Sequence, residues 1–436
     1  MRQRFFTLIL VSVTLMNAYS QDAESLASLW EKEHISNILP SDVRHADLKK
    51  YLSQLSANGV SVAEVGRSYA NREIFQVEWG HGPLKIFLWS QMHGDEPTAT
   101  SALVDMFAFL QKNREIGWVR KLSDAMTIRA VPMLNPDGAE IYQRRNSQGF
   151  DINRDALDLK TPEGRLLKQL RDAWNPAIGF NLHNQAALTT VGFTSRQASI
   201  SLLVVLGDEA KTITAGHERN QRISAAIITA LQKFIPGHIA RYSDKWTPTA
   251  FGDNLSAWGT PTILIETGAL HGKDEMFLVK MNFVAFLTAL NSIASGSERS
   301  QDPTLYVNLP ENSSGGLVDF IFRSANIIDP SNPGRLLIGD INAVTARRRA
   351  SFAAPVMIRS ISAFANVRGL VEYDASGYNV VQRFGRTAVG ELAEFYFYRR
   401  DRQVDWKSPD IESQFPPDAI FSTGRWTRGE KLLPQR

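Results

Sequence analysis

The sequence predicts an α/β fold, with a mostly parallel mixed sheet and helices on both of its faces, followed by a small β-rich C-terminal domain. Short apolar runs recur between residues 84 and 267, and helical patterns lie between them. Continuous apolar runs are typical of strands buried on both faces, and their alternation with helices favours a parallel sheet. Beyond residue 310 the pattern changes to short alternating segments, which predict the second, β-rich part.

The first 20 residues have the pattern of an export signal. Arg2 and Arg4 precede the apolar stretch Phe5 to Met16, and Ala18-Tyr19-Ser20 has the small-x-small form that signal peptidase reads. The stretch is about 12 residues long, whereas a membrane span needs about 20, and we expect no later segment to span either. The sequence therefore predicts cleavage before Gln21, a periplasmic or extracellular protein, and no integral membrane anchor.

The composition limits which residues could bind a metal or act as nucleophiles, and which partners the protein could have. A chain of 436 residues with 43% hydrophobic content can bury a large core, and two domains are expected. It has no cysteine, which excludes disulfides, thiolate ligands and a Cys nucleophile, so a metal would need His and carboxylate ligands. Removing Arg2 and Arg4 lowers the net charge from +3 to +1, which argues against nucleic acid as a partner. The run Arg347-Arg348-Arg349 lacks interleaved aromatic residues and is interpreted as a solvated face.

The elements of the first domain can be placed in chain order. Strands are expected at Leu84 to Trp89, Ile128 to Leu134, Ala177 to Leu182 and Thr262 to Ile265, and helices at Thr98 to Gln111 and Pro162 to Trp174. Thr161-Pro162-Glu163 supplies a capping residue, a proline for the first turn and an early acid. A final helix, with Phe277, Met281 and Val284 on one face, is expected to end near Ala294.

The β-rich part begins after a segment rich in Ser, Gly and Pro at Ser295 to Pro310. Its expected strands are Leu317 to Phe322, Arg335 to Ile338, Val356 to Ile361, Leu370 to Tyr373, Tyr378 to Val381 and Ala393 to Tyr398. Asp374-Ala375-Ser376-Gly377 predicts a hairpin turn between the fourth and fifth of these. The expected division of the chain is a signal peptide over 1–20, an α/β domain over 21–295 and a small β-rich accessory domain over 305–436.

Chemistry-bearing residues follow the predicted strands, at the edge where open α/β sheets bind ligands. His93 and Glu96 come just after the first strand, three positions apart, and could both turn toward one cation, while Pro97 suits the first position of the next helix. Taken alone, the pair is better explained by a strand-end His and a Glu that suits a helix N-terminus. His183 follows the third strand at the same edge and supplies a third ligand.

Three protein ligands and an open water position are typical of catalytic zinc, and His, Glu and His provide such a set without cysteine. Glu266, at the end of the last strand, could act as a general base beside that water. Between these positions lie Asn135-Pro136-Asp137-Gly138, interpreted as a tight turn in which Gly138 has a positive φ, and the polar stretch from Arg144 to Asp155.

Taken in order, His93-Gly-Asp-Glu96, Asn135-Pro-Asp-Gly, Arg144, Asp151-Ile-Asn153-Arg154, His183 and Ile265-Glu266-Thr resemble the M14 family of zinc carboxypeptidases. The resemblance covers roughly residues 40 to 295 and implies that family's fold. It implies one Zn²⁺ per chain, held by His93, Glu96 and His183. It also implies an exported metallocarboxypeptidase that hydrolyses a C-terminal peptide bond with a zinc-bound water activated by Glu266.

The same resemblance implies roles for the residues around the metal. Arg144 would polarise the scissile carbonyl, with Arg145 as the alternative if the alignment is shifted by one. Asn153 and Arg154 would bind the free carboxylate of a peptide or peptide-like substrate, and Asp151 would orient a zinc-binding His, with His93 the first candidate. Tyr242 is the nearest candidate for the tyrosine that closes over the substrate, although Ser243-Asp244-Lys245-Trp246 do not resemble its usual surroundings.

Two other functions stay open at this point. One is a zinc amidase or deacylase of the same superfamily that acts on muropeptides or N-acyl amino acids. The other is a non-catalytic binding protein with a vestigial site. The sequence carries no signal of the oligomeric state, so that state stays unknown.

Overall fold

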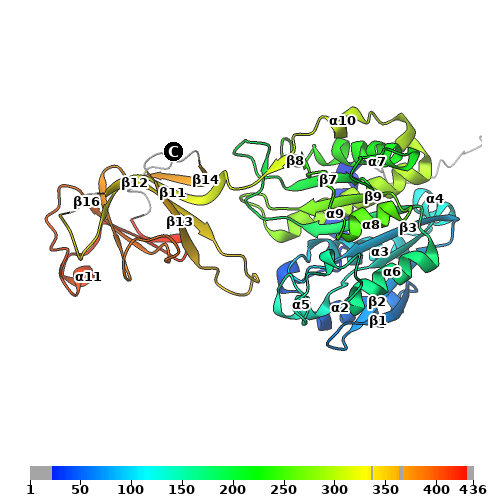
Figure 1. Cartoon of the computed structure of the whole chain (residues 1–436), viewed down its shortest axis with the longest axis horizontal. Coiled ribbons are helices and arrows are strands. Elements are labelled where there is room, and N and C mark those ends of the chain that lie inside the picture. Colours follow the sequence, from blue (N-terminus) through cyan, green and yellow to red (C-terminus); the bar gives the residue numbers. More distant parts are fainter. Residues whose placement is uncertain (1–21, 335–336, 363–366, 430–436) are drawn as a thin grey trace, which may run out of the picture.

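The computed structural model describes residues 22–334, 337–362 and 367–429, so the predicted signal peptide lies outside the described residues. Figure 1 shows two parts side by side, an α/β part and a smaller β part that is joined to it by a short segment. Each part has a large sheet of its own.

The sheet of the α/β part has eight strands, with its parallel strands in the centre. In spatial order they are β1 (Ser61–Arg67), β2 (Glu73–Gly80), β4 (Met126–Val131), β3 (Leu84–Ser90), β5 (Ile178–Asn184), β9 (Thr262–Thr267), β7 (Ile200–Val205) and β8 (Ile239–Arg241). β4, β3, β5 and β9 are parallel, whereas β2 and β7 join them antiparallel on the two sides. The predicted mixed sheet is therefore confirmed.

Helices cover both faces of this sheet, as predicted. One face carries α1 (Ala23–Glu33), α2 (His45–Ala57), α3 (Thr98–Lys112), α4 (Gly117–Ala125), α7 (Ala215–Leu231) and α9 (Glu275–Ser295), and the other carries α6 (Pro162–Trp174) and α8 (Phe251–Ala257). β3 shows why helices must cover both faces of the sheet, since its apolar side chains point to both. Its Ile86 and Leu88 belong to the core under the first set of helices, and its Phe87 and Trp89 to the core under the second.

Local patterns set several helix ends. α6 has the predicted bounds, and the Thr161 side chain accepts a hydrogen bond from the Gly164 N–H, as expected of an N-cap. α3 begins at Thr98, as expected, but Pro97 occupies its N-cap and not its first helical position. α9 is 21 residues long and apolar enough to cross a membrane, contrary to expectation, but 72% of its most apolar window is buried in the protein, as in a core helix.

The interpretation of Asn135 to Gly138 as a turn with a positive φ is wrong. β4 ends at Val131, and these residues begin α5 (Pro136–Ile141), where Asn135 caps the helix by accepting from the Gly138 N–H. Glycine is needed there for close packing, since a Cβ at Gly138 would lie 2.6 Å from the Gln143 carbonyl oxygen. Gly138 is absent from the residues with positive φ.

The β part is built on one curled sheet. Its strands run in the order β13 (Val356–Ser362), β12 (Leu337–Thr345), β11 (Leu317–Ile328), β15 (Tyr378–Gln382), β16 (Phe395–Arg399), β17 (Ala419–Ser422) and β18 (Arg425–Arg428), with β14 (Arg368–Asp374) also paired to β11. A short helix, α11 (Ile411–Gln414), precedes β17. The sheet curls around Phe322, so that the rings of Tyr373 in β14 and Trp426 in β18 lie 5.1 Å apart. The predicted β-rich part is confirmed.

The predicted hairpin at Asp374 to Gly377 is wrong. β14 and β15 do not pair with each other; both run parallel to β11, β14 beside Leu317 to Arg323 and β15 beside Asn326 to Ile328. Ser324 of β11, with φ of 56°, lies between these two stretches. Residues 374–377 therefore carry the chain from one half of β11 to the other, and the local turn signal could not show which strand is the partner.

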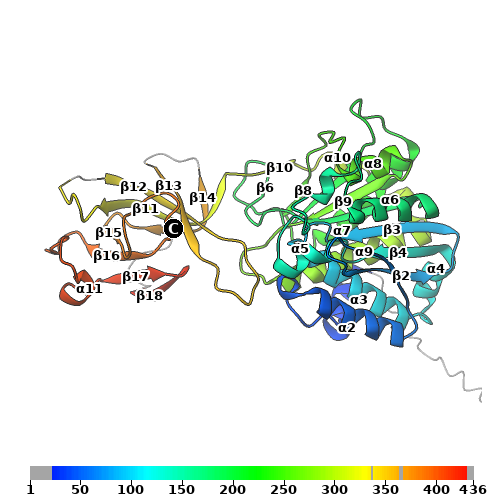
Figure 2. The ribbon, with the colours of Figure 1, turned by 60° about the horizontal axis from the view of Figure 1, so that its bottom comes forward.

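The segment between the two parts packs on the α/β part. It contains η3 (Ser297–Ser300), α10 (Thr304–Val307) and β10 (Asn312–Ser313). Tyr306 is buried in the larger core, and its hydroxyl accepts a hydrogen bond from the Val204 N–H at 2.8 Å. β10 pairs with β6 (Thr190–Val191). A second attachment is visible in Figure 2, where the loop between β12 and β13 extends toward α5.

Candidate active site

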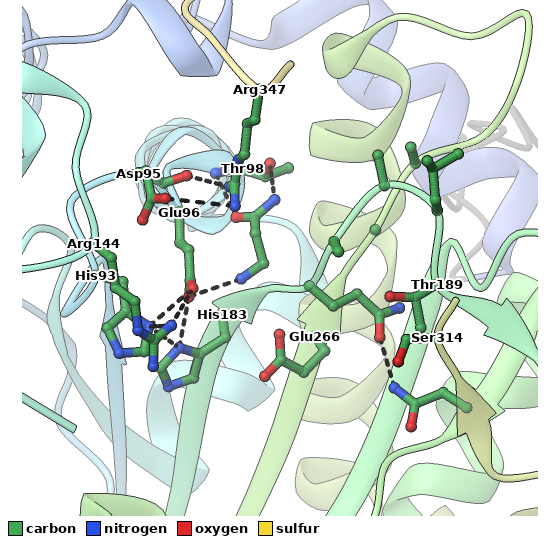
Figure 3. Close-up of a pocket in the computed structure, with 18 of the residues that line it drawn as sticks. His93, Asp95, Glu96, Thr98, Arg144, His183, Thr189, Glu266, Ser314 and Arg347 are labelled. Carbon is green, nitrogen blue, oxygen red and sulfur yellow. Dashed lines mark hydrogen bonds and ion pairs between the residues drawn. The ribbon is translucent and has the colours of Figure 1, made fainter. Parts of the chain in front are cut away.

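Three buried side chains meet at the carboxyl edge of the parallel strands. His93 follows β3, Glu96 precedes α3, and His183 lies at the end of β5 (Figure 3). His93 Nδ1 is 2.9 Å from Glu96 Oε1, and His183 Nδ1 is 2.7 Å from Glu96 Oε2 and 3.2 Å from His93 Nδ1. One potential ligand atom from each residue lies within 4.8 Å of the other two. The structure thus brings together the three residues that the sequence nominated as metal ligands.

The donor set fits a zinc ion. Tetrahedral zinc with bonds of about 2.0–2.1 Å places neighbouring ligand atoms about 3.3 Å apart. The three separations here are close to that value, at 2.7 to 3.2 Å. Burial raises the pKa of Glu96, but the charges of His93 and His183 outweigh burial and hold it well below its ordinary value. Burial lowers the pKa of His183, which keeps its ring in the neutral form that binds metals.

Asp151 and Arg144 support the triad from the side of η2 (Ile152–Arg154). Asp151 Oδ1 is 3.0 Å from His93 Nε2, and its Oδ2 accepts from Arg144 Nε at 3.0 Å. Burial lowers the pKa of His93, but the charge of Glu96 and the bonds to Asp151 and Glu96 raise it to about 9. A metal at His93 must therefore displace a proton, while Asp151 fixes the orientation of the ring.

Arg144 presents a positive charge to the triad. Its Nη1 is 3.1 Å from His93 Nδ1 and 3.3 Å from Glu96 Oε1. The neighbouring Arg145 is exposed and donates instead to the Gly149 carbonyl oxygen. Of the two arginines considered from the sequence, only Arg144 faces the triad.

Glu266 is the penultimate residue of β9 and lies directly beside His183, to which it is paired in the sheet. It is 8% exposed, and its Oε2 has no hydrogen-bond partner among the described residues. Burial, with the nearby charge of Glu96, raises the pKa of Glu266, whereas His93, Arg144 and Arg347 lower it. A buried carboxyl with a raised pKa and a free oxygen can take up a proton near neutral pH.

Asn153, Arg154 and Tyr242 line the same cavity as the triad. Asn153 is held by its Oδ1, which accepts from the Phe251 N–H at the start of α8. Arg154 is exposed. Burial and the charges of Glu266 and Glu96 raise the pKa of Tyr242 to about 12, so its phenol stays protonated. Tyr242 thus lies within reach of the acids of the site, although its flanking sequence is unusual.

Two neighbours of the triad were missed by the sequence. Asn184 donates its backbone N–H to Glu96 Oε2 at 3.1 Å, and its side chain bonds to Thr98 at the start of α3. Its place directly after His183, beyond the end of a predicted strand, could have revealed it. Arg347 comes from the β part and contacts Asp95, between two of the proposed ligands (Figure 3). No local signal connects these two residues.

The interpretation of Arg347 to Arg349 as a solvated face is wrong for Arg349, whereas Arg347 and Arg348 are exposed. Arg349 is 6% exposed and donates to the carbonyl oxygens of Ser41, Ala139 and Glu140. The guanidinium groups of Arg347 and Arg349 lie 5.8 and 5.4 Å from the centre of the Tyr142 ring. The aromatic partner that the run lacks in sequence is provided by the other part of the chain.

Residues 47–195 match the zinc carboxypeptidase family. The chain is 32% identical over 109 residues to a probable carboxypeptidase 2 of Trichophyton verrucosum, a match that covers 25% of this chain and 21% of that protein. It is also 31% identical over 131 residues to carboxypeptidase D of Anas platyrhynchos, covering 26% and 9%. The resemblance predicted from the motifs is therefore confirmed for this region.

The matches are partial. The matched stretch spans only about a fifth of the length of the first of these curated relatives. A solved metallo-carboxypeptidase from Burkholderia cenocepacia superposes on 58% of this chain and 69% of its own, with a TM-score of 0.47 and 16% identity.

Proposed function

We propose that this protein, whose residues 47–195 match the zinc carboxypeptidase family, is an exported zinc metallocarboxypeptidase. It would remove a residue from the C-terminal end of a peptide or peptide-like substrate. The observation that carries this proposal is the convergence of His93, Glu96 and His183 beside the buried, unpartnered carboxylate oxygen of Glu266.

The proposed roles follow from the contacts of each side chain. His93, Glu96 and His183 would hold one Zn²⁺, which supplies a Lewis acid and lowers the pKa of a bound water. Glu266 accepts the proton of the attacking water and returns it to the leaving amine. Asp151 keeps the His93 ring in place through its 3.0 Å contact.

The arginines supply fixed positive charge. Arg144, already 3.3 Å from Glu96 Oε1, stabilises the negative oxygen that develops on the scissile carbonyl. Asn153 and Arg154 bind the free carboxylate of the substrate, since a guanidinium can donate two parallel hydrogen bonds to a carboxylate. Tyr242, which lines the same cavity, closes over the bound residue.

The test of this assignment is the Glu266→Gln variant. We expect hydrolysis of C-terminal residues, followed by mass spectrometry of a peptide library, to fall by at least about 10³-fold, because the water loses its base. Zinc measured by elemental analysis should stay near one per chain. Glu115→Gln, at an exposed site, serves as the matched control. Normal turnover by Glu266→Gln would refute the role of this residue.

A carboxypeptidase can be distinguished from an amidase or deacylase by whether it requires a free carboxylate at the C-terminal end of the substrate. A peptide whose terminal carboxylate is converted to an amide should not be cleaved, because Asn153 and Arg154 would face no charge. Equal cleavage of the amide and the free acid would instead favour the amidase function.

We also infer export and two domains, a catalytic one over 21–295 and an accessory one over 305–436. The packing of Tyr306 and the pairing of β10 with β6 favour placing the division nearer residue 314. The intact mass of the protein recovered from outside the cytoplasm tests the export proposal, since it should correspond to a chain that begins at Gln21.

A further inference from the structure

The accessory domain forms one wall of the cavity that contains the triad. This cavity has a volume of about 1400 Å³, and it is lined by residues of both domains. On the accessory side the lining comes from residues 313–319 and 344–354 and from the strand β13. A substrate in the cavity therefore faces side chains that are absent from the catalytic domain.

This wall is held in place by the loop between β12 and β13. Arg349 donates to the carbonyl oxygens of Ser41 and Glu140 at 2.9 Å each. Two residues on, the Ser351 hydroxyl donates to Asp42 Oδ1 at 2.6 Å. Together with the pairing of β10 and β6, these bonds attach the domain at two separate places. Arg349 is used for this attachment and has little capacity left for a ligand.

Arg347, two residues earlier, is different. Its Nη2 donates to the backbone carbonyl oxygen of Asp95, and its Nη1 lies 3.7 Å from Asp95 Oδ2. The side chain stays 42% exposed at the cavity. A guanidinium has five N–H donors, so several remain for a ligand. The contact with Asp95 positions the Arg347 charge next to the triad without burying it.

The accessory wall carries excess positive charge. Its lining includes four arginines, Arg347, Arg348, Arg349 and Arg359, and one carboxylate, Asp319. Asp319 accepts a hydrogen bond from the Thr345 N–H. Within the described part of the chain, the side chains of Arg348 and Arg359 have no ion-pair partner. Such a wall favours a ligand with negative charge.

The position of Arg347 indicates which part of a substrate it would meet. Asn153 is bonded to the start of α8, which covers one face of the sheet. Asp95 lies three residues before α3, which covers the other face. The triad lies between them at the sheet edge. A peptide held at its carboxylate by Asn153 and Arg154 would thus extend past the triad toward Arg347.

We propose that Arg347, with Arg348 beside it, binds an acidic side chain on the N-terminal side of the scissile bond, so that the protein prefers peptides with acidic residues before the last one. Arg347 is thereby a specificity residue supplied to the active site by the accessory domain. The inference rests on the proposed function, because the direction of the peptide follows from the roles of Asn153 and Arg154.

The test uses two peptides that share their last residue and carry either three Glu or three Gln before it. With the zinc-loaded full chain, we expect kcat/KM for the Glu peptide to exceed that for the Gln peptide by about tenfold, the size of one well-placed charge contact. Arg347→Gln should remove most of this preference, so that the kcat/KM values of the two peptides differ by less than about threefold. Arg348→Gln, which changes a side chain without an ion-pair partner among the described residues, should reduce the preference by about twofold to fivefold.

Binding separates this inference from the proposed function. Fluorescent versions of both peptides are titrated into Glu266→Gln and into Glu266→Gln combined with Arg347→Gln. Tighter binding of the Glu peptide that is lost with Arg347 supports the inference even where no hydrolysis is detected. Equal binding and equal rates for the two peptides would overturn it while leaving the carboxypeptidase assignment intact. Arg425→Gln, at an exposed site far along the accessory domain, should change neither measurement.

Discussion

The two walls of the cavity are built in different ways. The catalytic wall gathers titratable groups within hydrogen-bond distance of one another, with His93, Glu96 and His183 all under 5% exposed. The accessory wall has one buried arginine, Arg349, bonded only to backbone oxygens, and the more exposed Arg347. Titratable side chains that pair with one another are concentrated where chemistry is proposed, whereas the buried arginine at the junction of the two parts bonds to backbone carbonyl oxygens.

Replacing His183 by Ala should have the largest effect, because it removes one of three ligands from the catalytic wall. We expect zinc per chain to fall well below one and hydrolysis to fall by at least about 10³-fold. Elemental analysis and the peptide assay measure both quantities. His81→Ala is the control, since His81 is 74% exposed and remote from the triad. Full zinc occupancy without His183 would contradict the proposed ligand set.

Asp151→Asn leaves the three proposed zinc ligands unchanged and tests the residue that orients one of them, His93. The amide can still accept a hydrogen bond from His93, but it lacks the charge that pairs with His93 and Arg144. Zinc affinity, measured by competition with a chelator, should weaken by about 10–100-fold. An unchanged affinity would mean that Asp151 serves only to fold its own loop, through its bond to the Asn153 N–H.

Arg349→Met should act on the accessory wall alone. It leaves the carbonyl oxygens of Ser41, Ala139 and Glu140 without their shared donor. We expect a loss of about 2 kcal/mol in unfolding free energy, or a Tm lower by about 4–8 °C, with zinc still near one per chain. Arg425→Met provides the baseline for an exposed arginine. A loss of zinc in Arg349→Met would show that the two walls are not independent.

Asp253→Asn should give the smallest effect, and one that depends on pH. Burial raises the pKa of Asp253 to about 6, although the Thr247 N–H bond opposes this. The unfolded carboxyl titrates near 3.8, so ionising the folded one costs stability that is absent below pH 4 and complete above pH 6. The amide should therefore raise the unfolding free energy by about 1 kcal/mol at pH 7.5, after allowance for partial exposure, and by nearly nothing at pH 4.

Thermal melts at several pH values, with and without zinc, measure the difference between Asp253→Asn and the parent. Asp124→Asn, at an exposed site, should show no such trend. A gain for Asp253→Asn that is equal at both ends of the pH range would argue against a raised pKa.

The residues of the catalytic wall could be predicted from the sequence, whereas the contacts of the accessory wall could not. His93, Glu96, His183 and Glu266 all follow buried apolar strands, and a parallel sheet brings such strand ends to one edge, so their meeting could be inferred from local patterns. Arg347 meets Asp95 only through the docking of two domains, 252 positions apart. Composition suggested solvent for that arginine run because its aromatic partner, Tyr142, belongs to the other domain.

The errors in the fold have a related cause. Asp374 to Gly377 carries a turn signal, but the chain keeps its direction across these residues, because both flanking strands run parallel to β11 and do not pair with each other. Asn135 to Gly138 likewise contains turn-forming residues that instead start α5. Local sequence reports where the chain can bend, whereas the choice of partner depends on burial of the whole sheet.

Tyr306 has a practical consequence for anyone who wishes to study the catalytic domain alone. A truncated protein that stopped at residue 295 would lose this side chain from the core and leave the Val204 N–H without its acceptor. Stopping after β10, near residue 314, would keep both, together with the strand that pairs with β6. Even then the carbonyl oxygens bonded to Arg349 would be open to water. The interface between the domains is therefore a poor place to truncate the chain. In limited proteolysis, we expect the first cleavage to occur elsewhere.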